Sequence, residues 1–401
     1  MNDTTSAEWA AYVGWYATYG FTVEIRYKAG ELLAAVPGVP PGYEMRLLPA
    51  GDHCFRIAGG PLTGAVSTFR LGGDGRAEAI AVGPEELSRI EEDQVKPPEP
   101  HTFLRAPAME TNPARDEAFA GLFRSILERR DGSWIDYQLP YPKHEFLRFV
   151  TDREAVLFHG SGRPDIDEFL PVRTSYELRD RGGRGNQQAV YATQDALWSM
   201  FFAIVDRSRI TGSIRNGVQY YHNRSGEPLA LYNFSINRQH LAEQPWRTGT
   251  LYFLPRESFV RMPLAGEAMS NEWASPVAVK PIARLRVEPE DFPFLHQIGG
   301  HDDDALLRYN QLEKTIVESV TGVQDEAGRL LLTLRRTPEL GECLVEFLKL
   351  QREFVPAAEV SVIDGEPVRI SVRGPAAFMQ VLRDSVARHL AAASPPGTTN
   401  D

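Results

Sequence analysis

The sequence has little cysteine and lacks the familiar catalytic signatures, and each absence argues against a class of protein. Only Cys54 and Cys343 occur, far apart and without a C-x-x-C partner. This usage argues against a disulfide framework and a structural zinc site, so no metal is expected. The chain also lacks a phosphate-binding G-x-x-x-x-G-K-[ST] loop, a G-x-S-x-G nucleophile elbow and an H-E-x-x-H metal helix.

Long apolar runs and excess positive charge are missing as well. No stretch reaches the roughly eighteen apolar residues that a membrane-spanning helix needs, so no membrane association is expected. Residues 1–8 are polar and acidic, unlike a secretion signal. Together these features predict a cytoplasmic protein. The net charge of −11 argues against general affinity for nucleic acid.

Length and composition predict a multidomain globular protein. A chain of 401 residues, 42% hydrophobic and 24% charged, exceeds what one core usually organises. Proline- and glycine-rich stretches mark the boundaries of five predicted segments. These are an N-terminal α+β module at 1–96, a proline-rich linker at 97–113, a central domain at 114–300, a C-terminal α+β segment at 301–392 and a disordered tail at 393–401.

Apolar periodicity predicts both helices and strands within these segments, so the fold class is α+β. Near the N-terminus, Trp9, Val13 and Tyr16 share one helix face behind a Ser6 cap, and a second short helix is expected at 85–90. Strands are expected at 21–27, 43–48, 53–57, 65–71, 155–158, 189–193, 229–234, 249–254 and 277–287. Further helices are expected at 116–129, from Pro142, and at 195–206, 305–320, 340–354 and 376–390, with a hairpin turn at Asp364-Gly365.

Three separated motifs at strand ends are candidates for chemistry. In the first, an apolar strand ends in His159, Gly160 and Ser161. A glycine at this point lets a ligand approach the backbone closely. Taken alone, the motif is more often a strand-ending turn with a partly exposed histidine.

The other two motifs carry an aromatic ring and a carboxylate. Tyr191 lies on a strand that runs directly into the helix at 195–206, where its ring is able either to stack on a planar ligand or to pack in the core. Glu272 stands beside Trp273 just before the strand expected at 277–287. A carboxylate there suits a base or a stabiliser of positive charge, although most such groups are solvated surface residues.

Taken in order, the three motifs resemble the histidine–tyrosine–glutamate branch of the ADP-ribosyltransferase superfamily. That family has a strand ending in His-Gly-(Ser/Thr), a later strand with tyrosine running into a helix, and a glutamate near a further strand. Here His159 and Tyr191 are 32 residues apart, and the resemblance covers about residues 155–287. It implies that the central domain is an ADP-ribosyltransferase-like split β-sheet flanked by two smaller α+β segments.

The resemblance also implies roles for individual residues. His159 would bond the adenosine-side ribose of NAD, the Gly160 backbone would pair with the nicotinamide amide, and Tyr191 would stack on the nicotinamide ring. Glu272 would bond the nicotinamide ribose and stabilise positive charge as the glycosidic bond breaks. Ser161 and an arginine of the 173–184 loop would hold ribose or pyrophosphate oxygens.

Two functions from different classes follow. In the first, the protein is a mono-ADP-ribosyltransferase or NAD glycohydrolase, with NAD as its substrate and a protein, nucleic acid or small molecule as its acceptor. In the second, the central fold is a catalytically inactive module that binds a partner. The first requires that His159, Tyr191 and Glu272 line one pocket.

Overall fold

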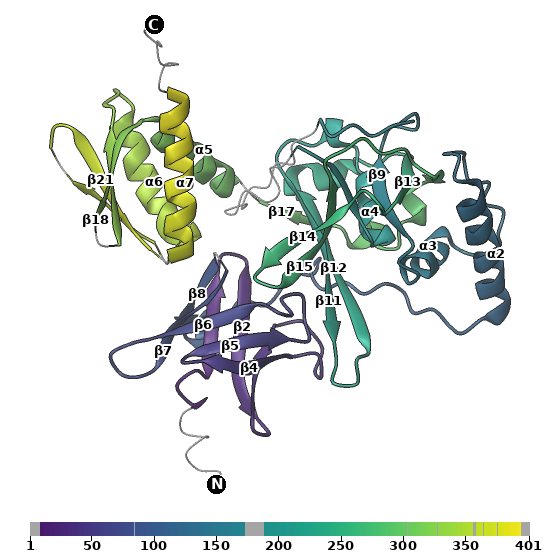
Figure 1. Ribbon diagram of the computed structural model, residues 1–401, viewed down its shortest axis with the longest axis horizontal. Helices are drawn as coiled ribbons and strands as arrows, with labels where there is room; N and C mark the ends of the chain where they lie inside the picture. Colours follow the sequence, from purple (N-terminus) through teal and green to yellow (C-terminus); the bar gives the residue numbers. More distant parts are fainter. Residues whose placement is uncertain are drawn as a thin grey trace, which may run out of the picture.

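The computed structural model describes residues 9–83, 85–172, 188–302, 304–326, 328–355, 358–363, 365–374 and 376–393. Helices and strands are mixed throughout the described chain, as the α+β assignment requires. Three main groups of buried apolar side chains lie in the N-terminal, central and C-terminal thirds of the chain. Figure 1 shows the N-terminal third in purple and blue, the central third in teal and the C-terminal third in yellow-green.

The N-terminal third is an eight-stranded closed barrel in which each strand pairs with its neighbours in sequence, and β1 also pairs with β8. Alternation explains the strands: in β6, every second side chain points into the core. The strands are β1 (Gly14–Thr18), β2 (Phe21–Lys28), β3 (Glu31–Ala35), β4 (Met45–Gly51), β5 (Cys54–Ala58), β6 (Val66–Leu71), β7 (Ala77–Val82) and β8 (Glu85–Ile90).

The barrel corrects the expected α+β module. Val13 and Tyr16 are not helical, because Tyr16 lies in β1 with its ring fully buried inside the barrel. The expected helix at 85–90 is strand β8. Both short segments gain two pairing partners by closing the barrel, and this pairing outweighs weak local helix signals. Ser6, the expected cap, lies outside the described residues.

The proline-rich segment expected as a linker packs against the domains on either side. Leu104 is buried, and its N–H donates to the Tyr232 carbonyl at 2.7 Å. At the barrel end, a Cβ added to Gly38 would lie 2.6 Å from the Phe103 ring and 3.1 Å from Pro98. The segment therefore follows the surface of both domains where it is described.

The central third contains a six-stranded sheet in the order β14-β15-β10-β9-β13-β16 and a three-stranded sheet in the order β11-β12-β17. Its strands are β9 (Val156–Ser161), β10 (Val190–Thr193), β11 (Ile214–His222), β12 (Pro228–Asn237), β13 (Gly249–Pro255), β14 (Val260–Ala265), β15 (Ala268–Ser275), β16 (Ala283–Val287) and β17 (Gly299–His301). Its α-helices are α2 (Pro113–Arg129), α3 (Lys143–Thr151) and α4 (Ala196–Ile204). The helices match the expected ones, whereas β11, β14, β15 and β17 were not expected, and the strand expected at 277–287 is present only as β16.

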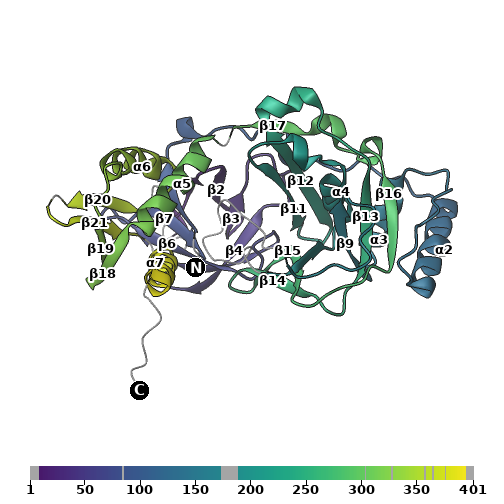
Figure 2. The same ribbon diagram turned by 90° about the horizontal axis from the view of Figure 1, so that it is seen from above.

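Helix α4 is the centre of this domain. It lies between the six-stranded sheet and the β11–β12 hairpin (Figure 2). Eight of its nine residues are buried, and the Phe201 and Phe234 ring centroids lie 4.9 Å apart across α4 and β12. A helix with apolar residues on all sides requires such a two-sided environment.

Two hairpins of the central domain pack against the barrel. Tyr221 and Leu231, from β11 and β12, join the buried cluster of the barrel, as does Ala268 of β15. At the edge of this interface, Arg56 of the barrel pairs with Glu267 at 2.6 Å. The first residue of β15, the strand that carries Glu272, is therefore packed against the barrel.

The C-terminal third is a four-stranded sheet in the order β18-β19-β21-β20, with three helices. Its elements are α5 (Asp304–Glu318), β18 (Val320–Glu326), β19 (Arg329–Leu334), α6 (Leu340–Phe354), β20 (Glu359–Ile363), β21 (Val368–Arg373) and α7 (Ala376–Ala393). The hairpin expected around Gly365 is present between β20 and β21. Asp364 and residues 394–401 of the expected tail lie outside the described residues. Within the described chain, we find no helix with the length and apolar character needed to cross a membrane.

Candidate functional site

The three strands that carry the sequence motifs are neighbours in the six-stranded sheet. Strand β10, with Tyr191, lies between β15, with Glu272, and β9, with His159. Thr193 of β10 pairs with Glu272 on one side and with Phe158 on the other. Segments more than a hundred residues apart in sequence therefore meet within one stretch of sheet.

His159 is tied to Tyr191 across the boundary between β9 and β10. Its Nδ1 lies 2.7 Å from the Tyr191 carbonyl oxygen. Because a carbonyl oxygen only accepts, Nδ1 must carry a proton, and in the neutral tautomer that fits this bond Nε2 is the acceptor nitrogen. The ring centroid lies 4.8 Å from that of Phe169, which limits ring rotation.

The pleat places the three side chains on two faces of the sheet. His159 is two residues from Leu157 and opposite Tyr252, both of which belong to one buried cluster. Tyr191 stands between two residues of that same cluster, so its ring points to the other face. Glu272 shares the face of Tyr191, because it pairs with a residue two positions along β10. The three side chains therefore do not share one face of the sheet, as the lining of a single pocket would require. His159 contacts the strand of Tyr191 through its hydrogen bond to the Tyr191 carbonyl.

Tyr191 and Glu272 are half-buried. The Tyr191 ring packs against Ala189, Met262 and Ala274. The Glu272 backbone N–H donates to the Ser270 hydroxyl at 3.1 Å. Glu272 lies within β15, which corrects the expectation that it precedes a strand. Pairing with both β10 and β14 makes this polar segment a strand despite its weak apolar pattern.

Gly160 is required by the close approach of α4. A Cβ at this position would lie 1.9 Å from the Ser199 carbonyl oxygen and 2.8 Å from the Ala203 nitrogen. Gly249 of β13 has the same role, because its Cβ would lie 2.1 Å from the Ala203 carbonyl oxygen. Gly160 was predicted to let a ligand approach the backbone. In the structure, the space that a side chain would occupy is filled by helix α4. Next to it, Ser161 is half-buried, and its hydroxyl accepts the Arg163 N–H at 3.1 Å.

A buried carboxylate behind the site was missed in the sequence. Asp195 is 1% exposed and accepts three hydrogen bonds, from the Trp198 N–H at 2.7 Å, the Tyr220 hydroxyl at 2.6 Å and the Tyr232 hydroxyl at 2.8 Å. It is the N-cap of α4. An aspartate before an apolar helix signals the cap, but nothing in the sequence signals the two tyrosines.

Asp195 connects α4 to the β11–β12 hairpin. Burial raises the pKa of its carboxyl group, against the opposing effect of hydrogen bonds from Tyr220, the Trp198 backbone and Tyr232. The same burial raises the pKa of both tyrosines well above the usual value. The tyrosines therefore remain donors, and they hold the hairpin on the helix that presses against Gly160.

We expect the stability conferred by Asp195 to fall as pH rises. A carboxyl group with a higher pKa in the folded chain binds its proton more tightly there, so unfolding becomes easier as pH rises from 3.8 through the raised pKa. The difference in unfolding free energy between wild type and Asp195→Asn should shrink over this interval. Urea unfolding at a series of pH values measures it. A difference that stays constant with pH would contradict a raised pKa.

Two further expectations from the sequence concern an arginine of the 173–184 loop and the lack of a metal site. The arginines at 173, 179, 181 and 184 lie outside the described residues. Among the residues that the structure does describe, no group of three or more histidine, cysteine, aspartate or glutamate side chains is arranged to hold a metal ion.

Comparison of the chain with family models, with curated proteins and with solved structures gives no match in any of the three. Any functional assignment therefore depends on the arrangement of these residues.

Proposed function

We propose that the central domain is ADP-ribosyltransferase-like and cleaves NAD, transferring ADP-ribose to an acceptor or to water. The observation that carries the proposal is the order β15-β10-β9, which brings the three motif strands together, with His159 hydrogen-bonded to the Tyr191 carbonyl.

In this proposal each residue has one task. The Nε2 atom of His159 accepts a hydrogen bond from a ribose hydroxyl, the Gly160 backbone pairs with the nicotinamide amide, and the Tyr191 ring stacks on nicotinamide. Ser161 holds a ribose or pyrophosphate oxygen. The C–N glycosidic bond breaks with its electron pair moving to nicotinamide, which leaves as the neutral base.

Glu272 acts on the sugar that remains. Loss of nicotinamide leaves an oxocarbenium-like ribose, and a half-buried carboxylate placed against that developing charge lowers the barrier. The acceptor then attacks the anomeric carbon and gives up its proton. With water as acceptor the product is free ADP-ribose, and with another nucleophile it is an ADP-ribosylated product.

NAD is expected to raise the thermal midpoint of the purified protein in a saturable way. At about 100-fold excess over Kd, a ligand of the folded state adds about 2.7 kcal/mol, or roughly 5–10 °C for a domain of this size. His159→Ala should lose most of this rise, because it removes the ribose contact. His296→Ala, an exposed histidine of the same domain, is the matched control. If the NAD-dependent rise in thermal midpoint is the same in His159→Ala as in wild type, NAD does not bind at this site.

A second candidate, a catalytically inactive binding module, is favoured by one observation. The His159 side chain lies on the opposite face of the sheet from Tyr191 and Glu272, so the three groups meet only at the β9–β10 boundary. For such a module, NAD turnover would be absent at every acceptor and enzyme concentration. Measured release of nicotinamide that saturates with NAD would exclude this candidate.

A further inference from the structure

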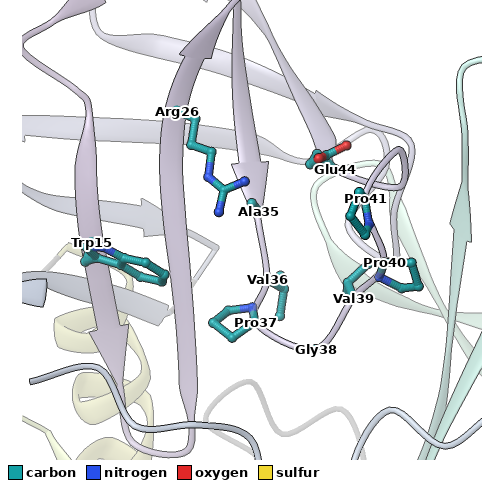
Figure 3. A pocket seen from close by; sticks show the side chains of 10 residues that line it. All are labelled: Trp15, Arg26, Ala35, Val36, Pro37, Gly38, Val39, Pro40, Pro41 and Glu44. Carbon is teal, nitrogen blue, oxygen red and sulfur yellow. The ribbon is translucent and has the colours of Figure 1, made fainter.

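The outer surface of the barrel contains a pocket far in sequence from the three motifs of the central domain. Its volume is about 200 Å³, and it is formed where the loop after β3 folds back over strands β1 to β3. Figure 3 shows the Trp15 ring on one side, Pro40 and Pro41 on the other, and the Arg26 guanidinium and Pro37 between them. The lining residues are Trp15, Arg26, Ala35, Val36, Pro37, Gly38, Val39, Pro40, Pro41 and Glu44.

Trp15 faces outward, because its neighbour Tyr16 fills the barrel interior. It lies in a row with Glu24 and Ala35, which pair directly across β1, β2 and β3. The indole is half-buried, and among the described residues no aromatic ring and no side-chain hydrogen-bond partner of Trp15 is found. Part of the indole therefore borders the pocket.

The loop that forms the opposite wall is rigid. The Val39 N–H donates to the Val36 carbonyl at 3.0 Å, which closes a tight turn. Three prolines restrict the backbone further, and the proline-rich segment at 97–113 holds the loop in place through Phe103 beside Gly38. A pocket already formed in the free protein loses little conformational entropy when a ligand enters.

The charged groups of the pocket exclude most charged ligands. Arg26 is held by Glu24 at 2.5 Å, and one Glu44 oxygen accepts the Gly42 N–H at 2.8 Å. The two carboxylates outnumber the one guanidinium, which is itself paired with Glu24, so the set opposes phosphates and carboxylates. An anionic ligand is therefore disfavoured, and the proposal takes a ligand without negative charge.

The same groups define the hydrogen-bonding pattern of that ligand. A guanidinium only donates and a carboxylate only accepts, so the ligand edge must carry an acceptor for Arg26 and a donor for Glu44. Its flat face must stack on indole. Nucleobases combine these features, and adenine presents ring-nitrogen acceptors beside an amino donor.

We propose that this pocket binds a neutral nucleobase or nucleoside, stacked on Trp15 between Arg26 and Glu44. The net charge of −11 opposes a nucleic-acid strand, so the ligand is a free small molecule. The proposal is independent of NAD cleavage in the central domain.

Adenosine is the probe that tests it. The chain has six tryptophans, so indole ¹⁵N labelling gives six N–H resonances, and Trp15→Phe identifies that of Trp15 by its disappearance. We expect adenosine to shift the Trp15 resonance saturably. Adenosine that shifts no indole resonance, or shifts several without saturation, would overturn the proposal.

Variants separate the contacts. Calorimetry should show adenosine binding weakened by about 5- to 150-fold in Trp15→Ala, the usual cost of removing a stacking aromatic ring, with Trp15→Phe within a few-fold of wild type. Glu44→Ala should also weaken binding. Trp134→Ala removes an exposed tryptophan of the central domain and should have no effect. Thermal midpoints check that each variant folds.

Two further ligands test the chemical class. Adenosine monophosphate should bind more weakly than adenosine, because its phosphate meets Glu24 and Glu44. Methyl glucoside, a neutral ring without a flat π-face, should not bind measurably. Tighter binding of the monophosphate or of the glucoside would replace the nucleoside assignment.

Discussion

Replacing Glu272 by glutamine is expected to lower nicotinamide release from NAD by about 10²- to 10³-fold, the usual effect of losing one preorganised group that stabilises transition-state charge. Glutamine keeps the size of the side chain and a hydrogen-bonding oxygen, but not the negative charge. Ground-state binding of NAD should therefore change little. The measurement pairs nicotinamide release with the NAD-dependent rise in thermal midpoint.

The matched control for this substitution is Glu257→Gln. Glu257 lies in the same domain, with a side chain 71% exposed and paired with Arg130 on the surface. Exposed pairs contribute little, so this variant should release nicotinamide at the wild-type rate. Equal rates in wild type and Glu272→Gln, measured with water and with added acceptors, would end the enzymatic proposal.

Gly160→Ala is expected to destabilise the central domain by about 3 kcal/mol or more, lowering its thermal midpoint by roughly 6–12 °C. The added methyl would meet the Ser199 carbonyl oxygen at 1.9 Å, and both partners are backbone held inside a sheet and a helix. Rotamer changes cannot relieve a clash between two backbones. Circular dichroism during heating measures the midpoint.

Two further substitutions serve as a parallel test and as a control. Gly249→Ala should be similarly destabilising, because its Cβ would meet the Ala203 carbonyl oxygen at 2.1 Å. Gly121→Ala, within α2 and with open space around the new methyl, should instead be neutral or stabilising by up to about 1 kcal/mol. An unchanged midpoint in Gly160→Ala would mean that α4 does not lie against β9 as described.

Local sequence patterns were sufficient to predict secondary structure where the apolar residues of a segment follow one clear helical or strand periodicity. The helices α2 and α6 and the strand β2 follow directly from the spacing of their apolar residues. The same reasoning failed for β1 and β8, because a segment of five or six residues with mixed character takes the structure that its neighbours impose. Strand β15 is the clearest case, since its polar residues form a strand through pairing on both sides.

The candidate site divides in the same way. The sequence by itself determined which residues are available for chemistry: a His-Gly-Ser strand end, a tyrosine before a helix and a glutamate beside a tryptophan. Only the tertiary structure decided that their strands are adjacent, that His159 lies on the other face from Tyr191, and that Gly160 faces α4. It also brought Asp195 together with Tyr220 and Tyr232. Side-chain type is a local property of the chain, whereas strand order, facing and burial depend on contacts between segments that no short stretch of sequence contains.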